Sequence, residues 1–174
     1  MNTGKTTILL ADDHAIVRRG IKALLEYEPD FAVVAEASDG LQALEQLEST
    51  KPDILVTDLC MPNMSGIELL KAIKEKNIPI RSVVLSMCGD PPYITGAMDA
   101  GAYGYVLKES GVEHLVTAIR EAKEGRRYLS PPLSITEPAA SHSPHPDVSC
   151  IIKTSKAEIH RPYLRSDFTF ETGA

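Results

Sequence analysis

The chain has 174 residues, of which 43% are hydrophobic and 24% charged, and its formal net charge is -6 at pH 7. These values are typical of a globular protein with one principal domain, and the negative charge argues against nucleic acid as the main partner. No apolar run reaches the roughly 18 residues of a membrane span, and the first residues, MNTGKTT, lack the pattern of a signal peptide, so we expect a cytoplasmic protein without a membrane segment.

Short apolar runs alternate with amphipathic stretches from residue 6 onward. We expect strands at 6–12, 31–37, 53–58, 81–87 and 102–108, and helices at 14–27, 39–49, 65–76, 91–100 and 111–124. The strands are apolar on successive residues, which predicts a parallel sheet covered on both faces. Ser38 or Asp39 can cap the second helix, and Ser65 lies near the start of the third. Five βα units with short connections predict an α/β, doubly wound, flavodoxin-like sheet of five strands in the order 2-1-3-4-5.

Polar residues stand at the carboxyl ends of four of these strands. The first strand ends on Asp12 and Asp13, the third on Asp58, the fourth on Ser86 and the fifth on Lys108. Ligands of a doubly wound sheet bind at this edge, where the strand order reverses. We therefore expect these side chains to converge on a single crevice.

The expected cluster of acids needs a positive partner. At about 4 Å and an effective dielectric near 20, each pair of carboxylates costs on the order of 4 kcal/mol. Lys108 can offset this repulsion, and so can a hard divalent cation such as Mg²⁺, which prefers oxygen ligands. Asp58 ends a rigid strand before the turn MPNMSG, as a nucleophile would be presented. A carboxylate can accept a phosphoryl group as an acyl phosphate, while a metal ion, a lysine and a hydroxyl group interact with the phosphoryl oxygens.

Four segments carry a family resemblance. ADDH, VTDLCMPNMSG, VVLSM and GYVLKES resemble the receiver domain of two-component response regulators. The stretch from GAMDAGAYGYVLKES to LVTAIREAKEGRRYLSP is most similar to the NarL/FixJ (LuxR-type) class. The resemblance covers about residues 6–130, and all five strand-end positions occur in order.

The resemblance implies a role for each site residue. Asp58 would be the phosphoacceptor and also a ligand of Mg²⁺, together with Asp12, Asp13 and the backbone carbonyl of Cys60, with Asp13 favoured over Asp12 as the direct ligand. Ser86 and Lys108 would bind the phosphoryl group, and Tyr105 matches the aromatic position that reorients on activation.

Two features depart from the commonest receiver pattern. The residue after the fifth-strand lysine is Glu109, where many receivers carry proline, and we interpret this as a trait of the subfamily. Cys60 and Cys88 border the expected phosphoryl site. We expect them to be small, reduced residues, and a redox role is the less favoured alternative. His14 is expected to face solvent at a helix start, without a special role.

The sequence changes character near residue 133. We expect a receiver domain over 6–128 and a largely flexible tail over 129–174, because SITEPAASHSPHPDVSC is rich in Pro, Ser and His. We find no recognisable helix-turn-helix domain and expect no direct DNA binding. Two accounts stay open. The chain is a stand-alone receiver that acts through protein contacts, or a transcriptional regulator whose reading frame was truncated or shifted near residue 133.

These observations predict a phosphorylation-dependent switch. A histidine kinase would supply the phosphoryl group to Asp58, and the added charge would draw Ser86 and Lys108 inward, so that Tyr105 turns into the vacated space. The surface around the fourth helix, fifth strand and fifth helix would then serve a homodimer or another partner. An aspartyl-phosphate phosphatase or phosphotransferase is the competing prediction, but short loops leave no room for a substrate cap. A degenerate receiver conflicts with the intact set of five residues, so we expect a switch and not a turnover enzyme.

Overall fold

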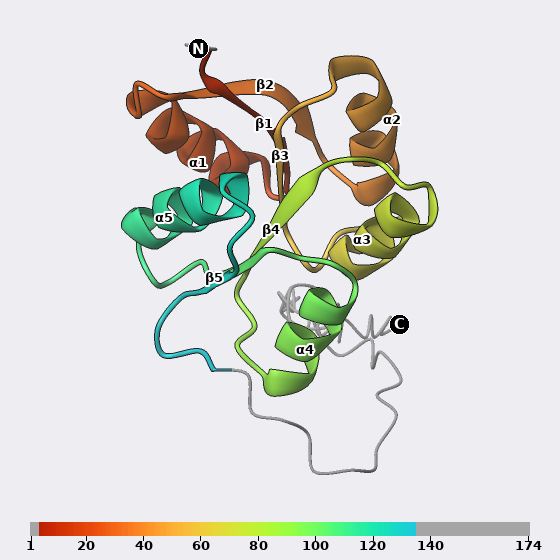
Figure 1. Ribbon diagram of the computed structural model, residues 1–174, viewed down its shortest axis with the longest axis vertical. Helices are drawn as coiled ribbons and strands as arrows, with labels where there is room; N and C mark the ends of the chain where they lie inside the picture. Colours follow the sequence, from red (N-terminus) through yellow and green to blue (C-terminus); the bar gives the residue numbers. More distant parts are fainter. Residues whose placement is uncertain (1–3, 135–174) are drawn as a thin grey trace, which may run out of the picture. The chain divides into compact units, whose positions relative to one another are not determined.

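The protein is built around a parallel sheet with helices on both sides, as Figure 1 shows for the computed structural model, which describes residues 4–134. The sheet has the order β2-β1-β3-β4-β5-β6, and every pairing is parallel. Its strands are β1 (Thr6–Ala11), β2 (Phe31–Ala37), β3 (Ile54–Thr57), β4 (Arg81–Ser86), β5 (Gly104–Leu107) and β6 (Tyr128–Leu129). The helices are α1 (Ala15–Tyr27), α2 (Gly40–Thr50), α3 (Gly66–Glu75), α4 (Pro91–Asp99) and α5 (Val112–Lys123). The predicted flavodoxin-like fold is confirmed.

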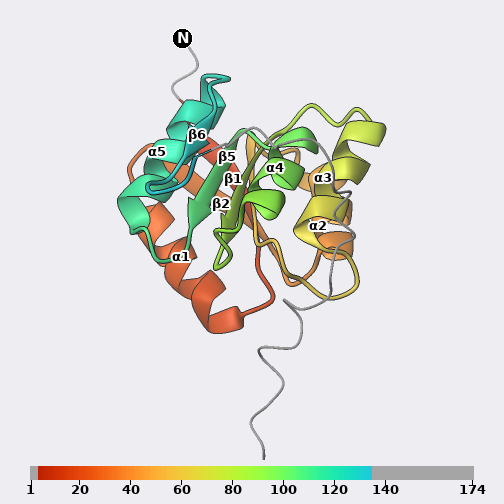
Figure 2. The ribbon, with the colours of Figure 1, turned by 90° about the horizontal axis from the view of Figure 1, so that it is seen from below.

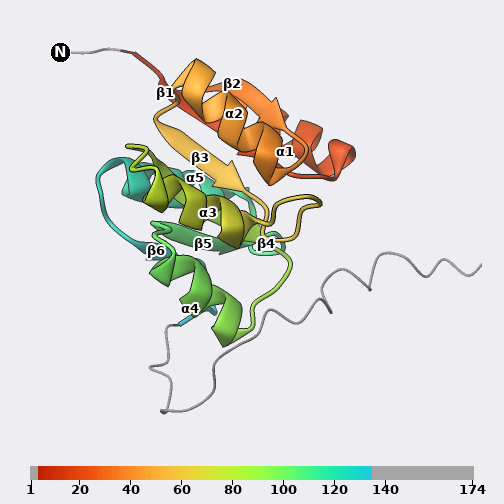
Figure 3. The same ribbon diagram turned by 90° about the vertical axis from the view of Figure 1, so that its right-hand side faces the viewer.

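Each face of the sheet has its own core. Helices α1 and α5 cover one face, and α2, α3 and α4 cover the other, as seen from below in Figure 2 and from the side of α2–α4 in Figure 3. Strand β1 serves both cores: Ile8 and Leu10 lie in the cluster under α1 and α5, whereas Leu9 and Ala11 pack under α2 and α3. Successive side chains of a strand point to opposite faces, so a sheet covered twice requires apolar residues at every position.

Local sequence determines where the helices start. Asp39 is the N-cap of α2 and accepts a hydrogen bond from the amide of Gln42, so the choice between Ser38 and Asp39 falls to Asp39. Ser65 caps α3 in a capping box with Glu68. The observed bounds of the ten predicted elements differ from the expected ones by no more than two residues.

A sixth strand extends the predicted order of five. The amide of Tyr128, the first residue of β6, donates to the carbonyl of Tyr103. The amide of Ser130, directly after β6, donates to the carbonyl of Tyr105. A strand of two residues is too short to show the alternating periodicity by which a strand is predicted from sequence. Its formation depends on pairing with the free edge of β5. The sequence therefore predicts β1–β5 correctly and misses β6.

The predicted tail is only partly described. Residues 129–134 pack against the domain through β6 and the turn after it. The rest of the predicted flexible tail of 129–174, namely residues 135–174, lies outside the described residues, and so do the segments on which the predictions of an absent DNA-binding domain and of a truncated reading frame depend. Among residues 4–134, no helix has both the length and the apolar character needed to cross a bilayer.

Candidate functional site

The carboxyl ends of β1, β3, β4 and β5 bring four predicted residues to one edge of the sheet. Asp12 directly follows β1 and is 1% exposed, and Asp58 directly follows β3 and is 6% exposed. Ser86 is the last residue of β4 and is also buried, and Lys108 follows β5. The parallel arrangement of the strands is the reason for this convergence, because all their carboxyl ends lie at the same edge.

Lys108 joins two acids from different strands. Its Nζ donates a hydrogen bond of 2.7 Å to Oδ2 of Asp12 and one of 2.6 Å to Oδ2 of Asp58. The lysine side chain is 10% exposed, so the three charged groups interact largely out of water. A single ammonium group thus offsets part of the repulsion between the two buried carboxylates.

Burial changes how these groups ionise. It raises the pKa of Asp58 above its ordinary value, although the nearby ammonium of Lys108 opposes the shift. Burial would lower the pKa of Lys108, but Asp58 and Asp12 outweigh this effect and raise it. The lysine therefore stays protonated, and Asp58 gives up its proton less readily than an exposed aspartate.

The loop after β3 fixes the orientation of Asp58. Its Oδ1 accepts a hydrogen bond of 2.6 Å from the amide of Leu59 and a longer one of 3.4 Å from that of Cys60. The start of α3 comes very close to this backbone, since a Cβ placed on Gly66 would lie 2.2 Å from the carbonyl oxygen of Asp58. The glycine of MPNMSG is therefore required by the close approach of α3 to the strand end.

Three carboxylates and a histidine form a group able to hold a metal ion. One ligand atom from each of Asp12, Asp13, His14 and Asp58 can be chosen so that all lie within 4.8 Å of one another. Against the three carboxylates stands one ammonium group, that of Lys108, which leaves an excess of two negative charges when the histidine is neutral. Oxygen donors with this excess charge suit a hard divalent cation.

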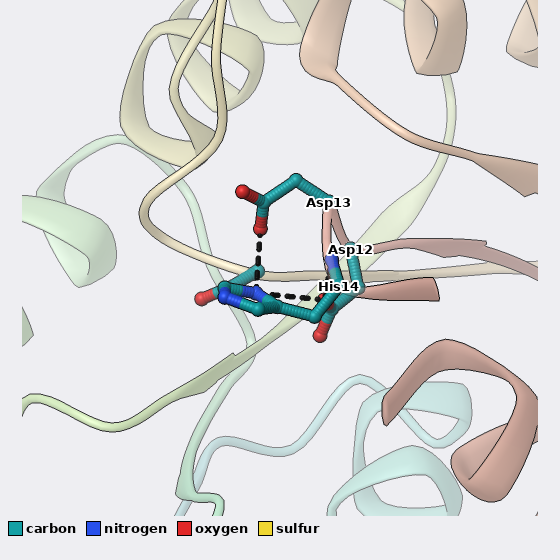
Figure 4. Close-up of side chains that lie close together, drawn as sticks. Asp12, Asp13 and His14 are labelled. Carbon is teal, nitrogen blue, oxygen red and sulfur yellow. Dashed lines mark hydrogen bonds and ion pairs between the residues drawn. The ribbon is translucent and has the colours of Figure 1, made fainter. Parts of the chain in front are cut away.

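His14 lies in this group although the sequence suggested no role for it. Its side chain is 51% exposed, in line with the expected position at a helix start. However, its Nδ1 lies 2.8 Å from Oδ1 of Asp13 and 3.5 Å from Oδ1 of Asp12, contacts that Figure 4 shows as dashed lines. In the sequence, the position of His14 directly after two acids at a strand end could have indicated that it belongs to the site.

Ser86 and Tyr105 hold the backbone of Cys88 from two sides. The Oγ of Ser86 accepts a hydrogen bond of 3.1 Å from the amide of Cys88, and the hydroxyl of Tyr105 donates one of 2.7 Å to its carbonyl. Tyr105 is fully buried, and this burial raises the pKa of its hydroxyl far above the ordinary value, so it remains a neutral donor. The loop between β4 and α4 is thereby tied to β5.

Comparison with known proteins gives consistent results. Residues 8–120 match the family of response regulator receiver domains. The chain is 41% identical over 133 residues to the nitrate/nitrite response regulator protein NarL of Escherichia coli (strain K12), a span that covers 76% of this chain and 62% of NarL. A LuxR-family two-component response regulator from Aurantimonas sp. SI85-9A1 is similar in structure, with a TM-score of 0.71 and 41% identity, over 74% of this chain and 91% of that one.

A third relative was solved in a phosphomimetic state. The isolated REC domain of RcsB from Salmonella enterica serovar Typhimurium, in the presence of BeF3⁻, has a TM-score of 0.67 and 30% identity, over 72% of this chain and 94% of that one. The chain spans 62% of the length of NarL, so these matches describe the receiver part of such regulators. The family match and the identity to NarL together show that the chain belongs to the response regulator receiver family, close to the NarL/LuxR class.

Proposed function

We propose that the protein is a phosphorylation-dependent signalling switch of a two-component system, in which Asp58 accepts a phosphoryl group. The observation that carries this proposal is the ammonium group of Lys108, shared between the buried carboxylates of Asp58 and Asp12. A carboxylate can attack an electrophilic phosphorus atom and form an acyl phosphate. The charge of Lys108 is then ready for the oxygens that arrive.

The proposed step is a displacement at phosphorus. A lone pair of an Asp58 carboxylate oxygen forms the new P–O bond while the bond between phosphorus and the donor group breaks. With phosphohistidine of a histidine kinase as the donor, the ring nitrogen keeps the electron pair of the broken bond and takes up a proton. Lys108 and the hydroxyl of Ser86 donate hydrogen bonds to the phosphoryl oxygens and so stabilise the charge that moves onto them.

The acids at this edge fit Mg²⁺ as the cofactor. Asp12, Asp13 and Asp58 offer carboxylate oxygens at the required proximity, and the backbone carbonyl of Cys60 is proposed as a further ligand. When bound, Mg²⁺ supplies neutralisation of the phosphoryl charge. His14 would border the ion from the side of α1.

The signal is proposed to leave the site through Cys88. The Oγ of Ser86 accepts the amide hydrogen of Cys88, and a phosphoryl group on Asp58 competes for this hydroxyl. When Ser86 turns to the phosphoryl group, the loop after β4 loses one of its two ties, and Tyr105, which is bound to the carbonyl of Cys88, can follow. The face formed by α4, β5 and α5 then changes shape and serves a homodimer or another protein partner.

We infer a switch in the cytoplasm and not a turnover enzyme. The loop between β3 and α3, residues 58–65, contains no inserted segment large enough to form a cap over Asp58. A phosphatase or phosphotransferase would need such a cap to enclose a small substrate. The acyl phosphate would instead persist until water hydrolyses it.

Phosphorylation by a small donor tests the proposal. The protein is incubated with acetyl phosphate and MgCl2, and its intact mass is measured with time. We expect one added phosphoryl group, labile to hydroxylamine, in the wild type and in the control variant Asp99→Asn, which changes an exposed acid at the end of α4. The variant Asp58→Asn should gain no mass.

Three results would contradict the proposal. The wild type could gain no mass, as expected for a degenerate receiver that binds without phosphorylation. Asp58→Asn could gain the same mass as the wild type, which would place the acceptor elsewhere. Rapid hydrolysis of many equivalents of acetyl phosphate would support the turnover enzyme.

A further inference from the structure

The chain that follows α5 returns along β5 and reaches the loops of the site. We call residues 128–133 the strap. It consists of β6 and the turn after it, and it lies outside the set of residues that the sequence connected with phosphorylation. Two of its residues, Ser130 and Leu133, contact the backbone around the site from different sides.

Ser130 replaces a backbone group in the sheet. Its amide donates to the carbonyl of Tyr105, and a regular parallel ladder would next use the Ser130 carbonyl to accept the amide of Leu107. Instead, the Oγ of Ser130 accepts this amide at 3.0 Å, and the Ser130 carbonyl accepts the amide of Leu133. The side chain thus completes the sheet while the backbone turns. Ser130 is fully buried, so water cannot take its place.

Ser130 is hydrogen-bonded to residues on both sides of Lys108 in the chain. Leu107 immediately precedes Lys108, and the amide of Ser110 donates to the carbonyl of Leu107. The hydroxyl of Ser110 in turn donates to the Oγ of Ser130 at 3.0 Å. On the other side, the amide of Lys108 donates to the carbonyl of Ser86 at 2.8 Å. The backbone of Lys108 is therefore fixed between β4 and the strap.

Leu133 contacts the loop after β4. A Cβ placed on Gly89 would lie 3.4 Å from Cδ2 of Leu133 and 3.4 Å from Cδ2 of Leu107. The Leu133 side chain therefore packs close to Gly89 and belongs to the apolar cluster that also contains Tyr105. Gly89 follows Cys88, whose backbone is held by Ser86 and Tyr105. The strap thus touches both segments that phosphorylation is proposed to move.

We propose that Ser130 is a positioning residue for Lys108, and that the strap couples the lysine turn to the loop after β4. This inference rests on the proposed function, because it gives the strap a part in phosphoryl transfer to Asp58. Coupling between two sites is reciprocal, so a group that positions Lys108 must itself respond when Lys108 binds the phosphoryl group. The response would arrive at Leu133, where the chain continues into its C-terminal part.

Removal of one hydroxyl tests the positioning role. In Ser130→Ala, the amide of Leu107 loses its acceptor, and the Lys108 turn loses its tie to the strap. We expect the rate of phosphorylation by acetyl phosphate to fall on the order of tenfold or more, because misplacement of a reacting group by about 1 Å can cost 10²-fold. The affinity for Mg²⁺, measured by titration, should change less than about twofold, since the carboxylates that would bind the ion do not contact Ser130.

The control separates positioning from stability. Ser82→Ala removes another buried serine hydroxyl, on β4 and away from the carboxyl ends of the strands, and it should leave the rate unchanged. A wild-type rate in Ser130→Ala overturns the inference and leaves the proposed function intact. If the wild type itself takes up no phosphoryl group, the proposed function fails and the inference fails with it.

A measurement on the unaltered protein does not depend on the folding of any variant. Amide hydrogen exchange is followed with and without BeF3⁻ and MgCl2. We expect the protection of the Ser130 and Leu133 amides to change severalfold on addition of BeF3⁻, while the amide of Leu47 in α2 serves as the reference. BeF3⁻ binding that alters exchange at Lys108 but leaves both strap amides unchanged would overturn the coupling.

Discussion

The ammonium nitrogen of Lys108 lies 2.6 Å from Oδ2 of Asp58, although 50 positions separate the two residues in the chain. The pair is largely buried, and the second carboxylate, that of Asp12, binds the same nitrogen. Removing the lysine from such a group leaves buried carboxylates without a compensating charge, which costs more free energy than the intact group contributes. The site is therefore expected to influence both the stability of the fold and its chemistry.

The variant Lys108→Ala should destabilise the protein and increase its response to magnesium. Asp12 and Asp58 would remain buried without their cation, which costs about 3–5 kcal/mol of the free energy of unfolding. The proposed binding of Mg²⁺ to the folded site should recover part of this loss. Urea unfolding with and without MgCl2 measures both effects. Lys71→Ala, at an exposed position of α3, should behave like the wild type. A loss below about 1 kcal/mol in Lys108→Ala would refute this expectation.

The variant Asp58→Asn should be more stable than the wild type at pH 7. Burial raises the pKa of Asp58 in the folded protein, so ionisation of this group at neutral pH costs stability. The cost is present above the folded pKa and disappears below the unfolded value of about 4, where both states are protonated. Thermal unfolding should therefore show a higher midpoint for the variant, with a gain that shrinks as the pH falls toward 4. A lower midpoint at pH 7 would contradict the assignment of the shift to burial.

Gly66→Ala should displace the backbone of Asp58, because α3 begins directly against it. The new Cβ would lie 2.2 Å from the carbonyl oxygen of Asp58, and neither the strand end nor the start of α3 can yield easily. We expect a loss of about 3 kcal/mol, at the upper end of the usual cost of overpacking, and slower phosphorylation of Asp58. Gly20→Ala is the matched control, because its Cβ would meet no atom within 4 Å and lies inside α1. It should stabilise the protein by about 0.5–1 kcal/mol. Equal stabilities of the two variants would disprove the steric argument.

Tyr105→Phe should loosen the loop after β4. The carbonyl of Cys88 would lose its buried donor while the aromatic ring stays in the core, at a cost of about 1–3 kcal/mol. Chemical unfolding gives the loss of stability, and hydrogen exchange at the Cys88 amide gives the local effect. Tyr27→Phe, at an exposed position of α1, should change neither quantity. Unaltered exchange at Cys88 in Tyr105→Phe would mean that the hydroxyl does not restrain the loop.

Glu36 should contribute stability that depends on pH. It accepts hydrogen bonds from Lys22 at 2.7 Å and from Arg18 at 3.3 Å, and the first of these is the main cause of its lowered pKa. A lowered pKa stabilises the fold above the unfolded value of about 4.5, and this contribution is lost as the pH falls through the folded pKa. Glu36→Gln should therefore cost up to about 1 kcal/mol at pH 7 and nothing at the acid end. Urea unfolding across this range is the measurement, with Glu45→Gln as an exposed control. A difference that persists in acid would exclude the ion pairs as its cause.

Much of the fold and the site could be predicted from the sequence because the signals are local. Strands covered on both faces must be apolar at successive positions, as Ile8 to Ala11 are, and the helices between them start at caps such as Asp39 and Ser65. A parallel sheet then places every strand end at one edge. The residue types at these ends, together with their order, were enough to indicate the family.

The contacts that connect the strand ends were decided by the tertiary structure. The two hydrogen bonds of Lys108 depend on how far a flexible side chain reaches across three strands, which no local pattern encodes. His14 joins the acids only through the direction in which its ring points at the start of α1. The strap exists because β5 leaves an open edge and Ser130 can complete it with a hydroxyl group. Local propensity determines where the helices and strands of this protein form. The geometry of packing determines which of its polar groups form hydrogen bonds and ion pairs with one another.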